Sequence, residues 1–248
     1  MPRAIAECKK EDPEISLVIA NGENAAHGMG ITKGVLDEIL EAGVDLVTLG
    51  DHTWDIKGVD DLLNREEIPL ICPANFPKLT LDKGWRILDV EGEKVLVINL
   101  IGRVFMKICP DCPLRAVDEI LKKCENKAKV VIVDFHAETT SEKNALGRYL
   151  AGRVSTVLGT HTHIQTADDK ILDGGTAYIT DVGMVGPLDS IIGAKKETVF
   201  DQLLSQVPFK YELSPDENIS VSAVILDIDE KTGKARGIKK VRKILKSI

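Results

Sequence analysis

The segment LGTHTHI (158–164) contains two histidines, His161 and His163, directly after an apolar run. In an extended chain, side chains that are two residues apart leave the same face. Both imidazoles can therefore reach one metal ion or two neighbouring ions. The spacing predicts a metal site in which these two histidines are ligands.

The other three histidines also follow stretches that have the pattern of strands. His27, His52 and His136 stand in NGENAAHG, GDHTWD and DFHAE. A lone histidine at a strand end is more often structural. Five of them favour a common site, because strand ends form the rim of an open α/β sheet where ligands bind. The carboxylates and amides that accompany the histidines are Glu23, Asn24, Asp51, Asp134 and Glu138.

The candidate ligands supply nitrogen and oxygen, and no thiolate lies close to them in the sequence. Imidazole combined with carboxylate and amide suits Mn, Fe, Zn, Co or Ni rather than Ca or Mg. Two such ions about 4 Å apart can hold a hydroxide nucleophile and neutralise the oxygens of a phosphate ester. A histidine outside the ligand set would then protonate the leaving oxygen. The residues indicate metal-dependent hydrolysis of a phosphate ester.

Apolar, β-branched runs alternate with helical patterns along the chain, which is typical of a layered α/β fold. The helical pattern at 32–43 has Thr32 as its expected N-cap and Gly43 as its expected C-cap. No repeat or linker is evident, so we expect one domain over residues 1–248, with antiparallel pairing late in the chain. The predicted strands are 15–21, 44–50, 94–100, 129–135, 154–159, 176–181 and 219–229.

The composition argues against several classes of function. The chain has 248 residues, and its formal net charge of −7 does not favour a broad nucleic-acid-binding surface. No apolar run is long enough to span a membrane and the start lacks a signal-peptide core, so we expect a cytoplasmic protein. The basic run 231–247 is expected to be a solvated turn and strand, although a role in attracting RNA stays open.

The five cysteines are scattered as in proteins of a reducing compartment. Cys109 and Cys112 form CPDC in front of a helical pattern. This spacing fits a loop without a further role, a reversible disulfide or half of a zinc site, and no second CxxC completes such a site. The loop without a further role is favoured, while a disulfide and a metal role stay open.

Seven motifs follow one another along the chain: NGENAAHG, GDHTWD, CPANFP, INLIGR, DFHAETTSEK, GTHTHIQTAD and GTAYITDVGMVGP. In this order they resemble the YmdB-like branch of the calcineurin-like metallophosphoesterases, over roughly residues 3–245. The resemblance implies a four-layer αββα sandwich and a dinuclear centre of Fe, Mn or Zn ions. It also implies hydrolysis of small phosphodiesters, with 2′,3′-cyclic nucleotides such as 2′,3′-cAMP among the substrates, and it fits a homo-oligomer.

The resemblance also implies roles for individual residues. Glu23 would bridge both ions, and His52 would donate the proton to the leaving group. The remaining ligands would be Asn24 and His163 for the first ion, and Asp51, His136 and His161 for the second.

Three more residues of these motifs receive weaker expectations. His27 is expected to line the cleft or to be structural, without a ligand role. Thr162 is expected to fix the loop between the two ligand histidines. Asp134 is expected either to orient an imidazole from outside the ligand set or to stabilise the fold.

The start of the sequence departs from the family pattern. The family begins with a strand whose GDxxG-type motif supplies an Asp to the first ion, and the helical pattern at 2–11 has no strand before it. We therefore expect a start that is truncated relative to the family, through a misassigned start codon or a real shortening. An unpaired sheet edge and a weak first site would follow.

A second departure concerns Asp51, which stands where the family usually has Asn. The additional charge should strengthen the second site, so we expect one ion to be held well and the other poorly. The alternative to an active enzyme is a catalytically impaired protein that binds metal or nucleotide and acts as a regulator.

Overall fold

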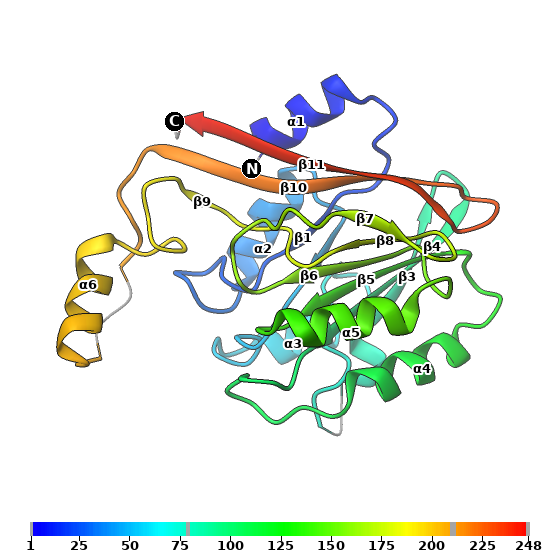
Figure 1. Ribbon diagram of the computed structural model, residues 1–248, viewed down its shortest axis with the longest axis horizontal. Helices are drawn as coiled ribbons and strands as arrows, with labels where there is room; N and C mark the ends of the chain where they lie inside the picture. The colour runs from blue at the N-terminus through cyan, green and yellow to red at the C-terminus, as the bar shows by residue number, and fades with distance from the viewer. Residues whose placement is uncertain (1, 78–79, 209–211, 247–248) are drawn as a thin grey trace.

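The protein is described here by a computed structural model that covers residues 2–77, 80–208 and 212–246 (Figure 1). The strands of the largest sheet are Trp85–Val90 (β3), Glu93–Ile101 (β4), Val130–His136 (β5), Thr156–Thr160 (β6), Lys170–Leu172 (β7) and Thr176–Ile179 (β8). Their order is β3-β4-β5-β6-β8-β7. The four inner strands are parallel, and the edge strands β3 and β7 are antiparallel to their neighbours.

Both faces of this sheet are buried, as the alternation along β5 shows. Val131 and Val133 belong to a core formed with α4 (Pro113–Lys123) and α5 (Thr140–Leu150), which cover one face (Figure 1). Val130 and Ile132 belong to a separate core on the opposite face. Because successive side chains of a strand point to opposite faces, an unbroken apolar strand needs cover on both.

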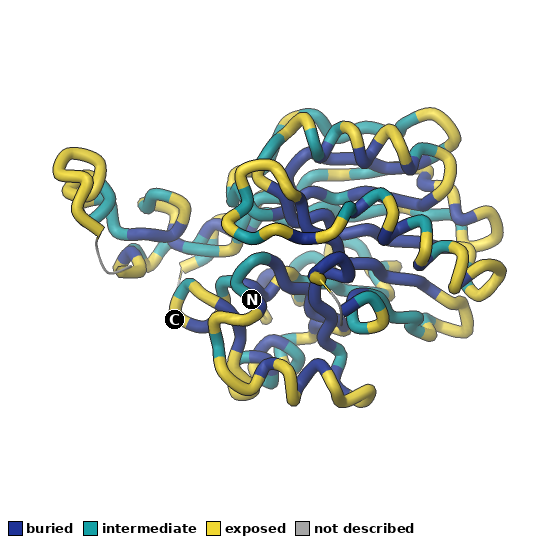
Figure 2. The backbone as a smooth tube through the Cα atoms, turned by 90° about the horizontal axis from the view of Figure 1, so that it is seen from below, coloured by how far each residue is buried: buried dark blue, intermediate teal, exposed yellow. Residues whose placement is uncertain are grey.

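Two smaller sheets lie on the opposite face. One is the parallel pair β1 (Ile19–Asn21) and β2 (Leu46–Thr48); the other is antiparallel and consists of β9 (Val185–Pro187), β10 (Asn218–Ile228) and β11 (Ala235–Lys246). A third core joins β2 to α2 (Lys33–Glu41) and α3 (Val59–Leu63), and Ile5 of α1 (Pro2–Glu11) packs against it. In Figure 2 the buried backbone concentrates in the strands, and exposed segments lie in loops and on outer helices.

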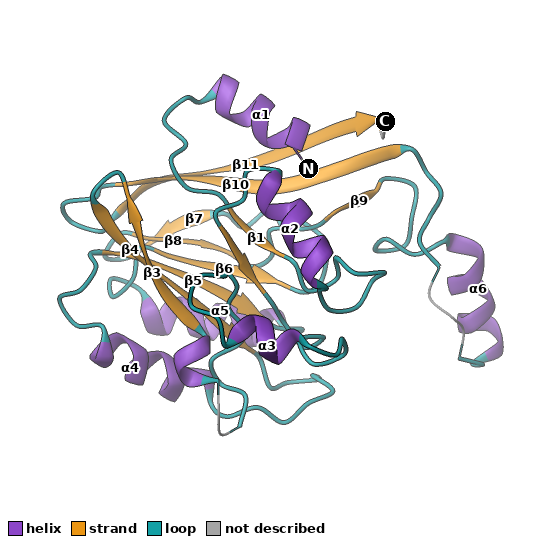
Figure 3. Cartoon of the chain, turned by 180° about the vertical axis from the view of Figure 1, so that it is seen from behind, coloured by secondary structure: helices purple, strands orange, loops and turns teal. Residues whose placement is uncertain are grey.

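Two further elements lie outside this arrangement of sheets. A short 3-10 helix, η1 (Leu81–Lys83), precedes β3. The helix α6 (Lys196–Ser205) stands away from the sheets on its own loop, as Figure 3 shows from behind. None of its residues is buried.

The expected mixed α/β class is confirmed, and each predicted strand overlaps an observed one. The strands that the sequence pattern did not predict are β3, β7 and β9. Two of them have three residues and β3 is a half-exposed edge, so their apolar patterns are short or incomplete. The count of four layers stays a prediction.

The predicted helix at 32–43 corresponds to α2, and one of its two caps is confirmed. Thr32 Oγ1 accepts a hydrogen bond from the Val35 N–H at 3.3 Å. The C-cap expectation was wrong by one residue, because Ala42 is the cap and Gly43 follows it with a φ of +96°. That left-handed conformation carries almost no penalty for glycine, which explains why a glycine stands at the end of this helix.

A cleft of about 2350 Å³ lies between the sheets and is lined by residues of α1, β1, β5 and β10. Within the described ranges, β1 pairs with β2 alone. The predicted ligands Asn24, His136, His161 and His163 lie on the wall of this cleft. The missing first strand stays a prediction.

No helix in the part of the chain that the structure describes is long and apolar enough to cross a membrane. A cytoplasmic location stays a prediction. The basic run forms β11, as expected for most of its length, while Ser247 lies outside the described residues. Several of its charges are paired, among them Lys243 with Glu11 and Arg236 with Asp229.

Candidate metal centre

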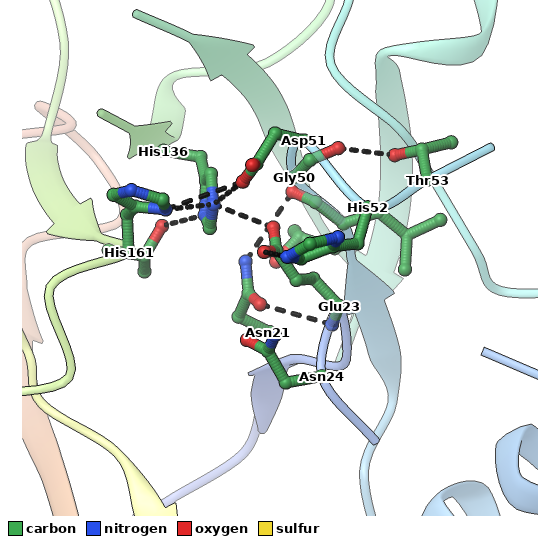
Figure 4. A network of polar contacts seen from close by, with 12 residues as sticks. Asn21, Glu23, Asn24, Gly50, Asp51, His52, Thr53, His136 and His161 are labelled. Atoms are coloured by element: carbon green, nitrogen blue, oxygen red, sulfur yellow. Dashed lines mark hydrogen bonds and ion pairs between the residues drawn. The ribbon is translucent and has the colours of Figure 1, made fainter. Parts of the chain in front are cut away.

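Four predicted ligands converge where strands of two sheets end. Glu23 follows β1, Asp51 follows β2, His136 ends β5 and His161 follows β6. One potential ligand atom from each of these residues lies within 4.8 Å of all the others (Figure 4). We call these four residues the second-ion cluster, because the family resemblance implies that three of them bind the second ion and that Glu23 binds both.

The tautomer of His136 is set by residues behind it. The Thr160 hydroxyl donates to Asp134 Oδ1 at 2.8 Å, so Thr160 Oγ1 can accept from His136 Nδ1 at 3.0 Å. The lone pair of Nε2 is then directed at the cluster. Nε2 lies 2.6 Å from Glu23 Oε2 and 3.1 Å from Asp51 Oδ1. A metal-binding imidazole is commonly held in this way by a partner on its other nitrogen.

The second histidine of the cluster is oriented by a carboxylate. His161 Nε2 lies 3.0 Å from Glu138 Oε2. An ionised carboxylate can only accept hydrogen bonds, so His161 Nε2 is the donor. His161 Nδ1 is therefore the nitrogen with a free lone pair. It lies 3.3 Å from Asp51 Oδ1 and 3.0 Å from His136 Nε2.

The cluster thus brings four acceptor atoms together, and this is the arrangement that a cation stabilises. Glu23 Oε2 is buried, and although it lies at ion-pair distance from His136, it takes part in no well-oriented hydrogen bond. Gly50 provides the room: a Cβ there would lie 1.5 Å from Glu23 Oε2 and 2.4 Å from His136 Nε2. The residues fit a divalent metal ion.

In the metal-free chain, the close approach of these groups shifts their pKa values. Burial alone disfavours the charged form of His136, but the charge of Glu23 and the contact with Asp51 outweigh it and raise the pKa of His136 to about 10. Burial likewise opposes the charge of Asp51, yet hydrogen bonds with His136 and His161 hold the pKa of this carboxyl well below its usual range. Burial raises the pKa of Asp134 in spite of its three donor partners.

Asn24 and His163, the first-ion pair, meet beside this cluster. His163 Nδ1 lies 3.1 Å from the Ile192 carbonyl, which only accepts, so Nδ1 donates. The Asn24 amide donates from Nδ2 to the Gly28 carbonyl at 3.0 Å, which turns Oδ1 toward His163. Asn24 Oδ1 and His163 Nε2 then face each other as two acceptors at 3.1 Å. A proton or a metal ion is needed between them.

His52 lies next to the second-ion cluster without belonging to it. Its Nδ1 contacts Asp55 Oδ2 at 2.7 Å, and its Nε2 is 4.0 Å from Glu23 Oε1. The imidazole side chain is one-fifth exposed. The Asp55 carboxylate therefore fixes the ring so that Nε2 faces the site, where it can hold or release a proton.

The family described as YmdB-like protein matches residues 3–241. The chain belongs to this family. It is 44% identical over 224 residues to the 2′,3′-cyclic-nucleotide 2′-phosphodiesterase of Bacillus subtilis (strain 168), covering 90% of this chain and 83% of that protein.

Two solved structures are also similar to the chain. A hypothetical protein from Thermus thermophilus superimposes with a TM-score of 0.88 and 42% identity, covering 98% of this chain and 94% of that one. A phosphatase from Mycoplasma pneumoniae superimposes with a TM-score of 0.89 and 32% identity, covering 99% and 88%. The expected family is confirmed, and the chain is an enzyme of the phosphoesterase class.

The remaining motif residues of this YmdB-like chain lie around the centre. His27 is exposed and lines the cleft with a φ of 56°. Thr162 donates to Asp181 and so is fixed to a neighbouring segment. Cys109 and Cys112 are free, Cys112 is the N-cap of α4, and neither belongs to the metal cluster found among the described residues.

Sequence reasoning missed several residues that orient the candidate ligands of this YmdB-like site. Glu138 was noticed beside His136 without a role, and its partner is His161. Asp55 follows His52 by three residues, a spacing that one turn can bring together. No local pattern marks Thr160 as the partner of His136, because the two residues meet only through the pairing of β5 with β6.

Proposed function

We propose that this chain hydrolyses small phosphodiesters, with cyclic nucleotides such as 2′,3′-cAMP among its substrates, by means of two divalent transition-metal ions (Fe, Mn or Zn). The observation that carries the proposal is the convergence of the second-ion cluster, whose His136 and His161 line the wall of a cleft. The substrate class is supported by the name of the Bacillus subtilis relative.

In this proposal the ligands divide as the family resemblance implies. The second-ion cluster holds one ion, and the first-ion pair holds the other together with Glu23. Bound divalent ions would neutralise the phosphoryl oxygens and supply an activated water for the attack on phosphorus. The chain orients the ligands through residues behind them: Thr160 and Asp134 behind His136, Glu138 behind His161, and the Ile192 carbonyl behind His163.

His52 is proposed to be the general acid. Its Nδ1 is held by Asp55 and its Nε2 faces the centre. When water adds to phosphorus, the bond from phosphorus to the leaving ribose oxygen breaks, and that oxygen takes the proton from His52 Nε2. Protonation of the leaving group by a positioned side chain contributes roughly 10²–10⁴-fold to such a rate.

A second candidate is a catalytically impaired protein that binds metal or nucleotide and regulates. The first-ion pair favours it, because only a neutral amide and one imidazole meet there beside the shared Glu23. A chain that loads only one ion would bind a phosphodiester without cleaving it efficiently.

Metal content and turnover together test the proposal. The purified chain is titrated with Mn²⁺, and bound ions per chain are measured beside the hydrolysis of bis-p-nitrophenyl phosphate and 2′,3′-cAMP. Two ions with turnover of both esters is the expected result. Tight 2′,3′-cAMP binding without turnover would support the regulator instead, and a chain that binds neither metal nor 2′,3′-cAMP would exclude both.

A further inference from the structure

The turn that carries the two ligand histidines has an uncommon backbone. His161 has a φ of 103° and His163 a φ of 66°, both in the positive region that residues other than glycine rarely adopt. Such residues persist only where the surrounding structure holds them in place. The His-Thr-His turn (161–163) therefore needs an external support.

That support comes from Asp181, which follows β8 and is fully buried. One of its oxygens, Oδ2, accepts from the Thr162 N–H at 3.0 Å and from the Thr162 hydroxyl at 2.8 Å. The same oxygen accepts from Lys143 Nζ at 2.7 Å, and the Lys143 side chain is only 1% exposed. Asp181 Oδ1 accepts from the Gly183 N–H at 2.9 Å.

The main chain around Asp181 contacts residues that flank this turn on both sides. The Thr166 N–H donates to the Asp181 carbonyl, and the Asp181 N–H donates to the Thr166 hydroxyl. Before the turn, β6 touches this segment so closely that a Cβ on Gly159 would lie 1.7 Å from the Thr180 carbonyl oxygen. The carboxylate is therefore held at a defined place relative to both ligand histidines.

A buried ion pair is weak evidence for stability, because the loss of hydration offsets the attraction between the charges. The role of the Lys143–Asp181 pair is therefore sought in the groups that it binds, which are the N–H and the hydroxyl of Thr162. We infer that Asp181, with Lys143 behind it, is a positioning unit that clamps the backbone and side chain of Thr162, so that His161 Nδ1 and His163 Nε2 face the metal centre. Neither residue touches substrate. This inference rests on the proposed function.

The test is metal affinity and ligand geometry, measured without turnover. Co²⁺ is titrated into Asp181→Asn while its visible absorption is recorded, since that spectrum reports the coordination geometry. The side-chain amide of asparagine is uncharged. It therefore does not offer the negatively charged oxygen that accepts from both Thr162 and Lys143 in the unmodified chain. We expect Co²⁺ to bind roughly 10–100-fold more weakly, the range typical of residues that orient metal ligands, with a changed spectrum.

Asp118→Asn is the matched control. Asp118 on α4 also accepts from a hydroxyl and from a cation, those of Tyr149 and Arg153, but none of these residues belongs to the segments around the turn. Its variant should bind Co²⁺ with the affinity and spectrum of the unmodified chain. Thermal unfolding of both variants is measured in the metal-free state, so that a general loss of stability is recognised.

A second pair of variants decides the question if Asp181→Asn does not fold. Thr162→Val removes only the hydroxyl donor and leaves the Lys143–Asp181 pair intact, whereas Thr162→Ser keeps the donor. We expect several-fold weaker Co²⁺ binding for the first and restored binding for the second. Unchanged affinity and spectrum in Thr162→Val would overturn this inference alone. An unmodified chain that binds no Co²⁺ would overturn it together with the proposed function.

Discussion

In the second-ion cluster, two carboxylates and two imidazoles from four strand ends lie within 4.8 Å, and each imidazole is oriented by a partner on its other nitrogen. In the first-ion pair, one amide oxygen and one imidazole meet at 3.1 Å, and neither carries a negative charge. His136 and His161 of the cluster line the same cleft as both residues of the first-ion pair, and the two groups share Glu23 as a proposed ligand.

The difference is one of charge and burial. Glu23 and His136 are almost fully buried, so the negative charge of Glu23 is weakly screened and attracts a cation strongly. His163 is only partly buried, and Asn24 contributes a dipole rather than a charge. The two ions should therefore bind with unequal affinity, and the following predictions test that inequality.

Gly50→Ala should have the largest effect. The new Cβ would overlap Glu23 Oε2 and His136 Nε2, so we expect the second-ion cluster to lose measurable Mn²⁺ binding and the chain to lose turnover. Metal content by elemental analysis checks this. Gly34→Ala is the control, because a Cβ added there in α2 would have nothing within 4 Å, and alanine should stabilise that helix by about 0.5–1 kcal/mol.

His52→Ala should be next in size. We expect turnover to fall by roughly 10²–10⁴-fold while both ions stay bound, because His52 Nε2 supplies a proton and no metal contact. Steady-state kinetics at saturating Mn²⁺ and metal analysis of the same sample measure the two effects separately. Loss of metal from this variant would make His52 a ligand and the assignment wrong.

His163→Ala should act on the weaker ion alone. We expect the weaker of two Mn²⁺ affinities to fall by at least about tenfold, since even residues that only orient a ligand contribute that much. Calorimetric titration resolves the two steps. His161→Ala should instead weaken the tighter binding step. Equal effects of the two variants on both steps would show that the second-ion cluster and the first-ion pair do not bind metal independently.

A change of one pH unit is expected to have the smallest effect. The folded-state pKa of His136 is about 10, above its ordinary value of about 6.5, so its imidazolium stabilises the metal-free fold fully below pH 6.5. That contribution is lost as the pH rises through 10. A metal ion must displace this proton, so affinity at the second-ion cluster should rise about tenfold per pH unit between about pH 7 and 9.

Titrations at several pH values measure this slope. The tighter Mn²⁺ step of the unmodified chain should show it in full. His27→Gln should leave the slope unchanged, because His27 is exposed and belongs to neither group. A tight step that does not respond to pH would contradict the proton displacement from His136.

Much of the proposed centre was predictable because its candidate ligands follow strands. The apolar runs before Asp51, His136 and His161 are long enough to mark β2, β5 and β6, and parallel strands end at a common edge. The residues that orient the ligands were less predictable. Asp181 lies eighteen residues after His163, and its distance from the turn depends on the pairing of β8 with β6.

By itself, the sequence determined which atoms could bind metal and that they would lie where strands end. Residue type and strand periodicity are local properties, so both can be read from the sequence. The tertiary structure decided which of these atoms face one another. Only packing between sheets placed Glu23 beside His136, and only packing set Thr160, Glu138 and Asp181 behind the ligands. The tautomer and direction of each imidazole follow from those partners, which are distant in the chain or cannot be recognised from local periodicity.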